Sequence, residues 1–260
     1  MAIPSKAVKS TAKAALKGRW LIACTSTIVF ILPIIIISFA TSLLSSILKD
    51  NIVFILWLLL NLFLVCPLFL GLIRFFKNLV FENVLGVQEI FIYFSCVKAY
   101  KRAMRLILDL LARFIFYSVV CFIPAGIVKL ITSDFFFDLL NVDIPLWSES
   151  LGALLSFLIG MAALAIFVLM LRYYLAPFLL VANDDMSVDE AIHMASVIAR
   201  RSSGELWSLI FSFLGYLLLS LFVVPIIFTL PYFLCALTVH ARYSVTGYNL
   251  NLTQENTRNF

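Results

Sequence analysis

The chain has 260 residues, of which 63% are hydrophobic, 15% aromatic and only 13% charged. Soluble globular domains carry about 25% charged residues, so this composition excludes a soluble protein and leaves room for about six membrane helices of roughly 20 residues each. The net charge of +5 lies beside apolar runs, which favours anionic lipid headgroups over nucleic acid as the partner of those charges.

The N-terminal part of the chain predicts a helical hairpin. A basic arm without acids precedes an apolar run at residues 20–44, which is longer than the ~7–15 apolar residues of a cleavable signal peptide, so we predict an uncleaved first span. The second span, 51–73, contains no charge and ends at Arg74-Phe75-Phe76, a cation beside aromatic rings that is typical of a membrane interface. The cations of the arm are Lys6, Lys9, Lys13, Lys17 and Arg19.

An amphipathic helix is predicted on the cytoplasmic surface before the third span. Four of its cations recur at i, i+3, i+4 and i+7, which places them on one helical face. We expect that face to contact the phosphates of anionic headgroups, in preference to forming a specific phosphate site. The four residues of this basic stripe are Lys98, Lys101, Arg102 and Arg105.

The second hairpin consists of predicted spans at 106–131 and 151–171. The first of them carries Asp109 and Arg113 at its inner end, one helical turn apart. The segment between the two spans is acidic and lacks Lys and Arg from residue 130 to residue 150, which is typical of the outer side of a membrane. The second span of the hairpin has no charge and ends at Arg172-Tyr173-Tyr174.

A second amphipathic cytoplasmic helix is indicated after the fourth span. Ser187 and Glu190 have the spacing of a capping box, in which each side chain bonds the backbone N–H of the other residue. From there apolar and polar residues fall on opposite helical faces. The apolar face holds Val188, Ala191, Ile192, Ala195, Ile198 and Ala199, and the polar face holds Asp189, His193, Ser196 and Arg200.

The last apolar stretch, residues 206–239, contains no charge. A single helix of that length would measure about 51 Å, against a hydrocarbon core of about 30 Å. Pro225 and Pro231 divide the stretch, so we predict two spans, 206–222 and 225–243. The result is an all-α fold: six transmembrane helices in three hairpins within one domain, residues 1–243. The polar tail, 244–260, is expected to be loose.

The positive charges predict the orientation of these spans. All but two of the 19 Lys and Arg residues, namely all but Lys49 and Lys129, fall in segments that the six spans place on one side. Since an excess of Lys and Arg marks the cytoplasmic side, we expect a multi-pass protein of the cell inner or plasma membrane, with both termini in the cytoplasm. A single crossing by residues 206–239 would place Arg242 and Arg258 outside.

Short motifs in a fixed order are similar to those of a known bacterial family. The segment Leu16-Lys17-Gly18-Arg19-Trp20 is similar to the opening Leu-Lys-Gly-x-Trp of that family, and Gly71-Leu72-Ile73-Arg74-Phe75-Phe76 is similar to the end of its second span. From about Ala15 to Tyr243 the chain resembles the integral membrane proteins grouped as the domain of unknown function family 975. The resemblance implies a six-helix membrane protein without established catalytic residues, and a more distant similarity to membrane regions attached to some bacterial glycerophosphodiester phosphodiesterases. Further motifs that carry it are Asn183-Asp184, Ser187, Glu190-Ala191, Ser196, Trp207 and Leu214-Gly215-Tyr216.

Enzyme chemistry needs a nucleophile, a base or a metal in a defined set, and the sequence shows no motif for one. We therefore expect no catalytic residue, no cofactor and no metal site. Polar residues inside a bilayer are candidates for function, and here they are Asn61, Asp109 and Arg113. The structural alternatives are a hydrogen bond between helices for Asn61 and an interfacial salt bridge for the other two.

Two functions fit these features. The first is a non-enzymatic scaffold or accessory to a membrane transport or envelope system, which binds lipids and a protein partner in the membrane. The alternative is a transporter or channel for a small solute or ion, with the polar residues inside the bilayer nearest its path. The sequence favours the first, because a transport path usually shows more than one deep charge.

Overall fold

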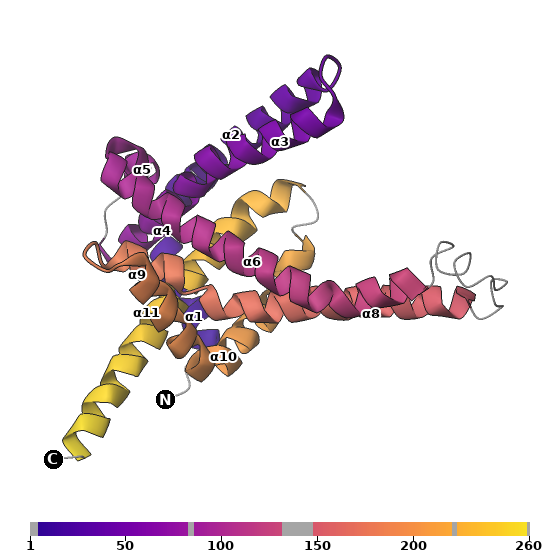
Figure 1. Cartoon of the computed structure of the whole chain (residues 1–260). Helices are drawn as coiled ribbons and strands as arrows, with labels where there is room; N and C mark the ends of the chain where they lie inside the picture. The colour runs from indigo at the N-terminus through magenta and orange to yellow at the C-terminus, as the bar shows by residue number, and fades with distance from the viewer. Residues whose placement is uncertain (1–4, 83–85, 132–147, 220–222, 259–260) are drawn as a thin grey trace. The chain divides into compact units, whose positions relative to one another are not determined.

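The computed structural model describes residues 5–82, 86–131, 148–219 and 223–258, and Figure 1 shows the course of the chain. These residues are almost entirely helical and include no strand, which confirms the predicted all-α fold. Within them five helical runs are long and apolar enough to cross a membrane: Trp20–Leu44, Asp50–Phe81, Val97–Ile131, Gly152–Ala182 and Pro225–Asn249. The predicted span 206–222 is not among these five, so the count of six stays a prediction.

Contacts divide the chain into two compact units, residues 1–107 with 174–260 and residues 108–173. The helices of the first unit are α1 (Ser5–Leu16), α2 (Trp20–Leu44), α3 (Asp50–Leu60), α4 (Cys66–Phe81), α5 (Ile92–Ser95), α9 (Ala176–Ala182), α10 (Val188–Leu219) and α11 (Val223–Arg258). The second unit holds α8 (Ser148–Met170) and most of α6 (Val97–Ile131). Shorter turns are the π-helical η1 (Asn61–Val65) and the 3-10 turns η2 (Val87–Phe91) and η3 (Leu171–Tyr173). Most of the acidic segment predicted between the third and fourth spans, residues 132–147, lies outside the described residues.

The basic N-terminal arm forms an amphipathic helix, α1, which its charges alone did not indicate. Val8, Ala12 and Leu16 recur every four residues and are all buried, because that spacing keeps them on one helical face. On another face, the Lys9 ammonium donates a hydrogen bond to the Ser212 carbonyl and lies 4.5 Å from the centroid of the Phe213 ring. The arm is thus part of the folded core of the first unit.

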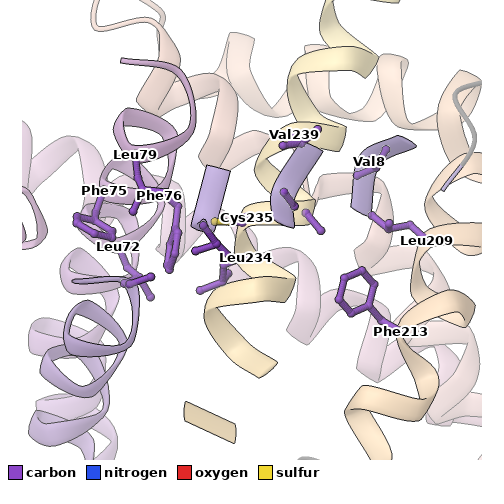
Figure 2. Close-up of a cluster of buried hydrophobic side chains, with 14 of the residues drawn as sticks. Val8, Leu72, Phe75, Phe76, Leu79, Leu209, Phe213, Leu234, Cys235 and Val239 are labelled. Atoms are coloured by element: carbon purple, nitrogen blue, oxygen red, sulfur yellow. The ribbon is translucent and has the colours of Figure 1, made fainter. Parts of the chain in front are cut away.

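The core of the first unit joins segments that are far apart in the sequence. Figure 2 shows side chains of α1, α4, α10 and α11 packed together, including Val8, Phe76, Leu209 and Cys235. Phe75 and Phe76 are completely buried. The prediction that Arg74-Phe75-Phe76 ends the second span at the membrane interface is therefore wrong for the two rings, because the helix continues to Phe81 and buries them in protein.

The two predicted surface helices continue into predicted spans without a break. α6 joins the basic stripe to residues 106–131, and α10 joins residues 188–200 to residues 206–219. A change from polar to apolar side chains leaves the backbone hydrogen bonds intact, so it does not end a helix; Pro does so far more often.

The end of the chain also differs from the prediction. α11 begins at Val223, so Pro225 lies in its first turn, where proline is tolerated. Pro231 lies inside the same helix. The helix then runs on to Arg258, so the tail that we expected to be loose is helical as far as that residue.

Candidate functional site

A cluster of paired charges joins α4, η2, α6 and the start of α10 with the turn before it, and we call it the charged cluster. It consists of Arg74, Glu89, Arg102, Arg105, Asp184 and Asp189. Two of its members belong to the predicted basic stripe on α6. All six lie in the first unit.

Arg102 holds the turn that precedes α10. Its Nη2 donates to the carbonyl oxygens of Asn183, at 2.6 Å, and Met186, at 2.5 Å. Its Nη1 lies 3.7 Å from Asp184 Oδ1. Because two backbone carbonyls and one carboxylate meet a single guanidinium, the planar fork of arginine suits this position better than the point charge of lysine would.

Arg74 adds a second cation to the same carboxylate. Its Nη1 lies 3.6 Å from Asp184 Oδ1 and its Nε lies 3.3 Å from Glu89 Oε2. Tyr93 is buried beside it; burial raises the pKa of that phenol, and the charge of Arg74 opposes this shift. The segment 87–93 can approach α4 closely because Gly71 has no side chain: a Cβ there would lie 2.6 Å from the Ile90 carbonyl carbon.

The start of α10 has the predicted capping box. Ser187 N–H donates to Glu190 Oε2 at 2.9 Å, and Glu190 N–H donates to Ser187 Oγ at 3.2 Å. The Ser187 donors hold the pKa of the Glu190 carboxyl below its usual value. Next to it, Arg105 donates to Asp189 Oδ2 at 2.7 Å, so that the first turn of α10 is fixed to α6.

The charged cluster has a structural role, because it fixes the turn before α10 to α6. Asp184 is 73% exposed, so each of its ion pairs contributes only about 0–1 kcal/mol. The hydrogen bonds from Arg102 to two carbonyls are worth more, because a charged donor strengthens them and the one to Met186 is partly buried. Together they fix the turn at 183–187 against α6.

The members of the basic stripe differ in their surroundings. Arg102 and Arg105 bind the segment 183–189, whereas Lys98 and Lys101 are exposed. Within the basic stripe, the two lysines are therefore the residues that are accessible to lipid phosphates. Their contact with headgroups remains a prediction.

The three polar residues predicted inside the bilayer belong to different units. Asn61, in the first unit, donates to the carbonyl of Trp57 on its own helix at 2.8 Å and opens the π-helical turn η1. Arg113, in the second unit, lies 5.2 Å from the ring centroid of Tyr173. Asp109 lies one turn before Arg113 on α6 and is half-buried.

A pair that the sequence did not indicate is half-buried Tyr174 with buried His240. The Tyr174 hydroxyl lies 2.8 Å from His240 Nδ1, and His240 is only 2% exposed. The Ser202 hydroxyl donates to the carbonyl of Ile198 on its own helix, at 3.2 Å. His240 Nε2 meets no hydrogen-bond partner among the described residues. The two members of the pair are 66 positions apart, and no local motif of the sequence links them.

No group of three His, Cys, Asp or Glu side chains in the described part of the chain comes together as a metal-binding set. The five cysteines are free thiols.

One comparison with known proteins gave a match. A family model described as "Protein of unknown function (DUF975)" matches residues 1–244, which is the family whose motifs the sequence resembles. No curated protein and no solved structure matches the chain.

Proposed function

The chain belongs to this family of proteins of unknown function, and from that premise we propose that it is a non-enzymatic scaffold or accessory to a membrane transport or envelope system. Its apolar surface supports a place in the membrane: the most apolar windows of α6 and α2 bury only 6% and 28% of their residues inside the protein. Surfaces of this size on soluble monomers are rare. A bilayer would cover them.

The proposal includes six spans, two amphipathic cytoplasmic helices and both termini in the cytoplasm of a bacterial cell. The distribution of Lys and Arg supports this orientation. The charged cluster supports the accessory role, because its cations and acids bind one another and so hold α4, α6 and α10 in place.

A groove beside the charged cluster is the surface where we place a partner. Its volume is about 620 Å³, and its lining combines acidic residues with the side chains of Met186 and Met194. Acidic groups with flexible thioethers suit a cationic amphipathic segment of another protein, since methionine adapts its shape and the charges are complementary. The polar lining consists of Asn183, Asp185, Asp189, Glu190 and His193.

Site-specific photocrosslinking in native membranes tests this proposal. A crosslinking residue at His193, which is exposed beside the groove, should give a protein adduct that weakens as ionic strength rises. The adduct should also weaken in Arg102→Gln, which releases the turn at 183–187. The control position is Phe39, which is 65% exposed on the apolar surface of α2. Equal adducts at both positions, or none at His193, would contradict the proposal.

Transport of a small solute or ion is the second candidate, and one observation favours it. The imidazole of His240 is buried in the candidate span Pro225–Asn249, and one of its nitrogens has no hydrogen-bond partner in the part of the chain that the structure describes. It is the kind of group that proton and ion pathways use. The test is solute flux in proteoliposomes, with losses expected in His240→Gln, Asn61→Ala and Asp109→Asn. An absence of flux over a broad panel of solutes and ions would eliminate this candidate.

A further inference from the structure

A cavity of about 480 Å³ lies between α4, α9 and α11. Ligand pockets usually measure about 300–1,000 Å³, so it is large enough for a small molecule or for part of a lipid. Its inner wall is apolar, with Ile73 and Leu179 both buried. Its rim is polar and includes Lys77, Glu82 and Arg242.

The cavity lies where three candidate spans end. The α4 run ends at Phe81 and the α9 run at Ala182, and both residues line the cavity. On α11 the lining reaches Thr246, close to the end of the candidate span at Asn249. An apolar wall that gives way to a charged rim at this level corresponds to the boundary between acyl chains and headgroups.

The charges of the rim leave one cation unpaired. Lys77 Nζ lies 2.8 Å from Glu82 Oε1, so these two neutralise each other. The Arg242 guanidinium lies 4.1 Å from the centroid of the Phe81 ring, and among the described residues it meets no carboxylate. Stacking on a ring uses the face of a guanidinium and leaves the N–H donors at its edge available.

We propose that this cavity binds an anionic phospholipid, with Arg242 donating to the phosphodiester and the apolar wall receiving the adjoining part of an acyl chain. One unpaired positive charge on the rim matches the single negative charge of a phosphodiester. A planar guanidinium held in place by Phe81 loses little freedom when it forms a bidentate contact with phosphate. Phe178, half-buried in the lining, adds a further apolar surface beside the chain.

The test measures how tightly the delipidated full chain, in a neutral detergent, retains phosphatidylglycerol and phosphatidylcholine by native mass spectrometry. Wild-type protein should prefer phosphatidylglycerol. Arg242→Gln should lower that affinity roughly tenfold, as expected when one charge-assisted contact is lost. Arg200→Gln, which removes the same charge from an exposed site on α10 outside the cavity, should leave the affinity unchanged.

Two further measurements distinguish a phospholipid site from a site for free phosphate and test the role of the cavity. Inorganic phosphate at millimolar concentration should not displace phosphatidylglycerol if the acyl chain contributes, and displacement would show a site for free phosphate instead. Ala182→Phe fills the cavity without replacing a charged residue. It should lower phosphatidylglycerol retention while the thermal midpoint in detergent stays near that of wild type. Equal retention by wild type, Arg242→Gln and Ala182→Phe would overturn the proposal.

Discussion

At the scale of single residues, two glycines in the short motifs have separate structural roles. Gly18 has a φ of 77°, a left-handed conformation that ends α1 and allows the chain to turn into α2. Gly71 has an ordinary helical backbone but lies against the Ile90 carbonyl. The motifs could be recognised in the sequence, but only the structure shows that one glycine serves a turn and the other a close contact.

Replacing each glycine by alanine should therefore have different costs. Gly71→Ala should destabilise the protein by about 3 kcal/mol, the upper part of the range for overpacking, because the neighbouring atoms belong to the backbone and cannot rotate away. Gly18→Ala should cost about 1–2 kcal/mol through the backbone alone, since nothing lies within 4 Å of its Cβ position. Unfolding free energies in detergent measure both.

The matched control for both glycines is Gly160→Ala. Gly160 lies within α8 with open space around its Cβ position, so alanine should be neutral or slightly stabilising there. A Gly71→Ala protein as stable as the Gly160→Ala protein would refute the close contact with Ile90.

Cys96 should be the most reactive of the five thiols. It is fully exposed before the first turn of α6, and the backbone N–H groups of Lys98 and Ala99 lower the pKa of its thiol. Because the thiolate is the reacting form, alkylation of Cys96 should reach half its maximal rate at a lower pH than that of N-acetylcysteine. Mass spectrometry of the labelled protein measures this, and Cys96→Ser should abolish the fast phase. A half-maximal pH at or above that of the free thiol would be inconsistent with donation from the α6 backbone.

At the scale of the helices, the sequence identified apolar segments more reliably than helix boundaries. The runs at 20–44 and 151–171 correspond closely to α2 and α8. By contrast, the surface helices and the spans that we predicted as separate segments are continuous in α6 and α10. Near residues 105 and 205 the side chains change from polar to apolar. Such a change indicates a different environment around the helix and not the end of the helix.

The amphipathic helix α1 was detectable in principle, because its apolar residues follow a helical period among the lysines. Leu16→Ala should cost about 2–5 kcal/mol, since Leu16 is completely buried in the core. The control, Leu21→Ala, makes the same change five residues later at a side chain that is 80% exposed, and it should cost little. Thermal or denaturant unfolding in detergent distinguishes the two. Equal effects would mean that α1 does not pack in the core.

The charged cluster could be found only in the structure, because each ion pair that α6 forms with the turn before α10 or with the first turn of α10 joins residues more than 80 positions apart. Arg102 and Arg105 look equivalent in the sequence but not in the fold. Arg102→Gln should cost about 1–3 kcal/mol by removing two charge-assisted hydrogen bonds, one of them partly buried. Arg105→Gln should cost at most about 1 kcal/mol, because that pair is largely exposed. Unfolding free energies compare the two variants, and a larger loss for Arg105 would contradict the role given to Arg102.

At the scale of the whole molecule, the cavity at Arg242 bears on the number of spans. Phe81 and Ala182, at the ends of two candidate spans, line it together with Arg242 and Thr246 near the end of a third. If these three candidate spans cross a membrane, their shared cavity requires that they end on the same side of it. We then expect the chain between Ala182 and Arg242 to cross an even number of times, so that the apolar end of α10 crosses together with α11.

With this arrangement the C-terminus lies on the same side as Cys96, and the distribution of Lys and Arg predicts that this side is the cytoplasm. A C-terminal alkaline phosphatase fusion should be inactive and a C-terminal fluorescent fusion bright. A membrane-impermeant maleimide should label Cys96 in inverted vesicles but not in intact spheroplasts, with Cys96→Ser as the control for the signal. An active phosphatase together with labelling of Cys96 only in inverted vesicles would place the C-terminus and Cys96 on opposite sides of the membrane. The span at 206–222 would then be absent, and Arg242 would lie across the membrane from the end of α4, which the shared cavity does not allow.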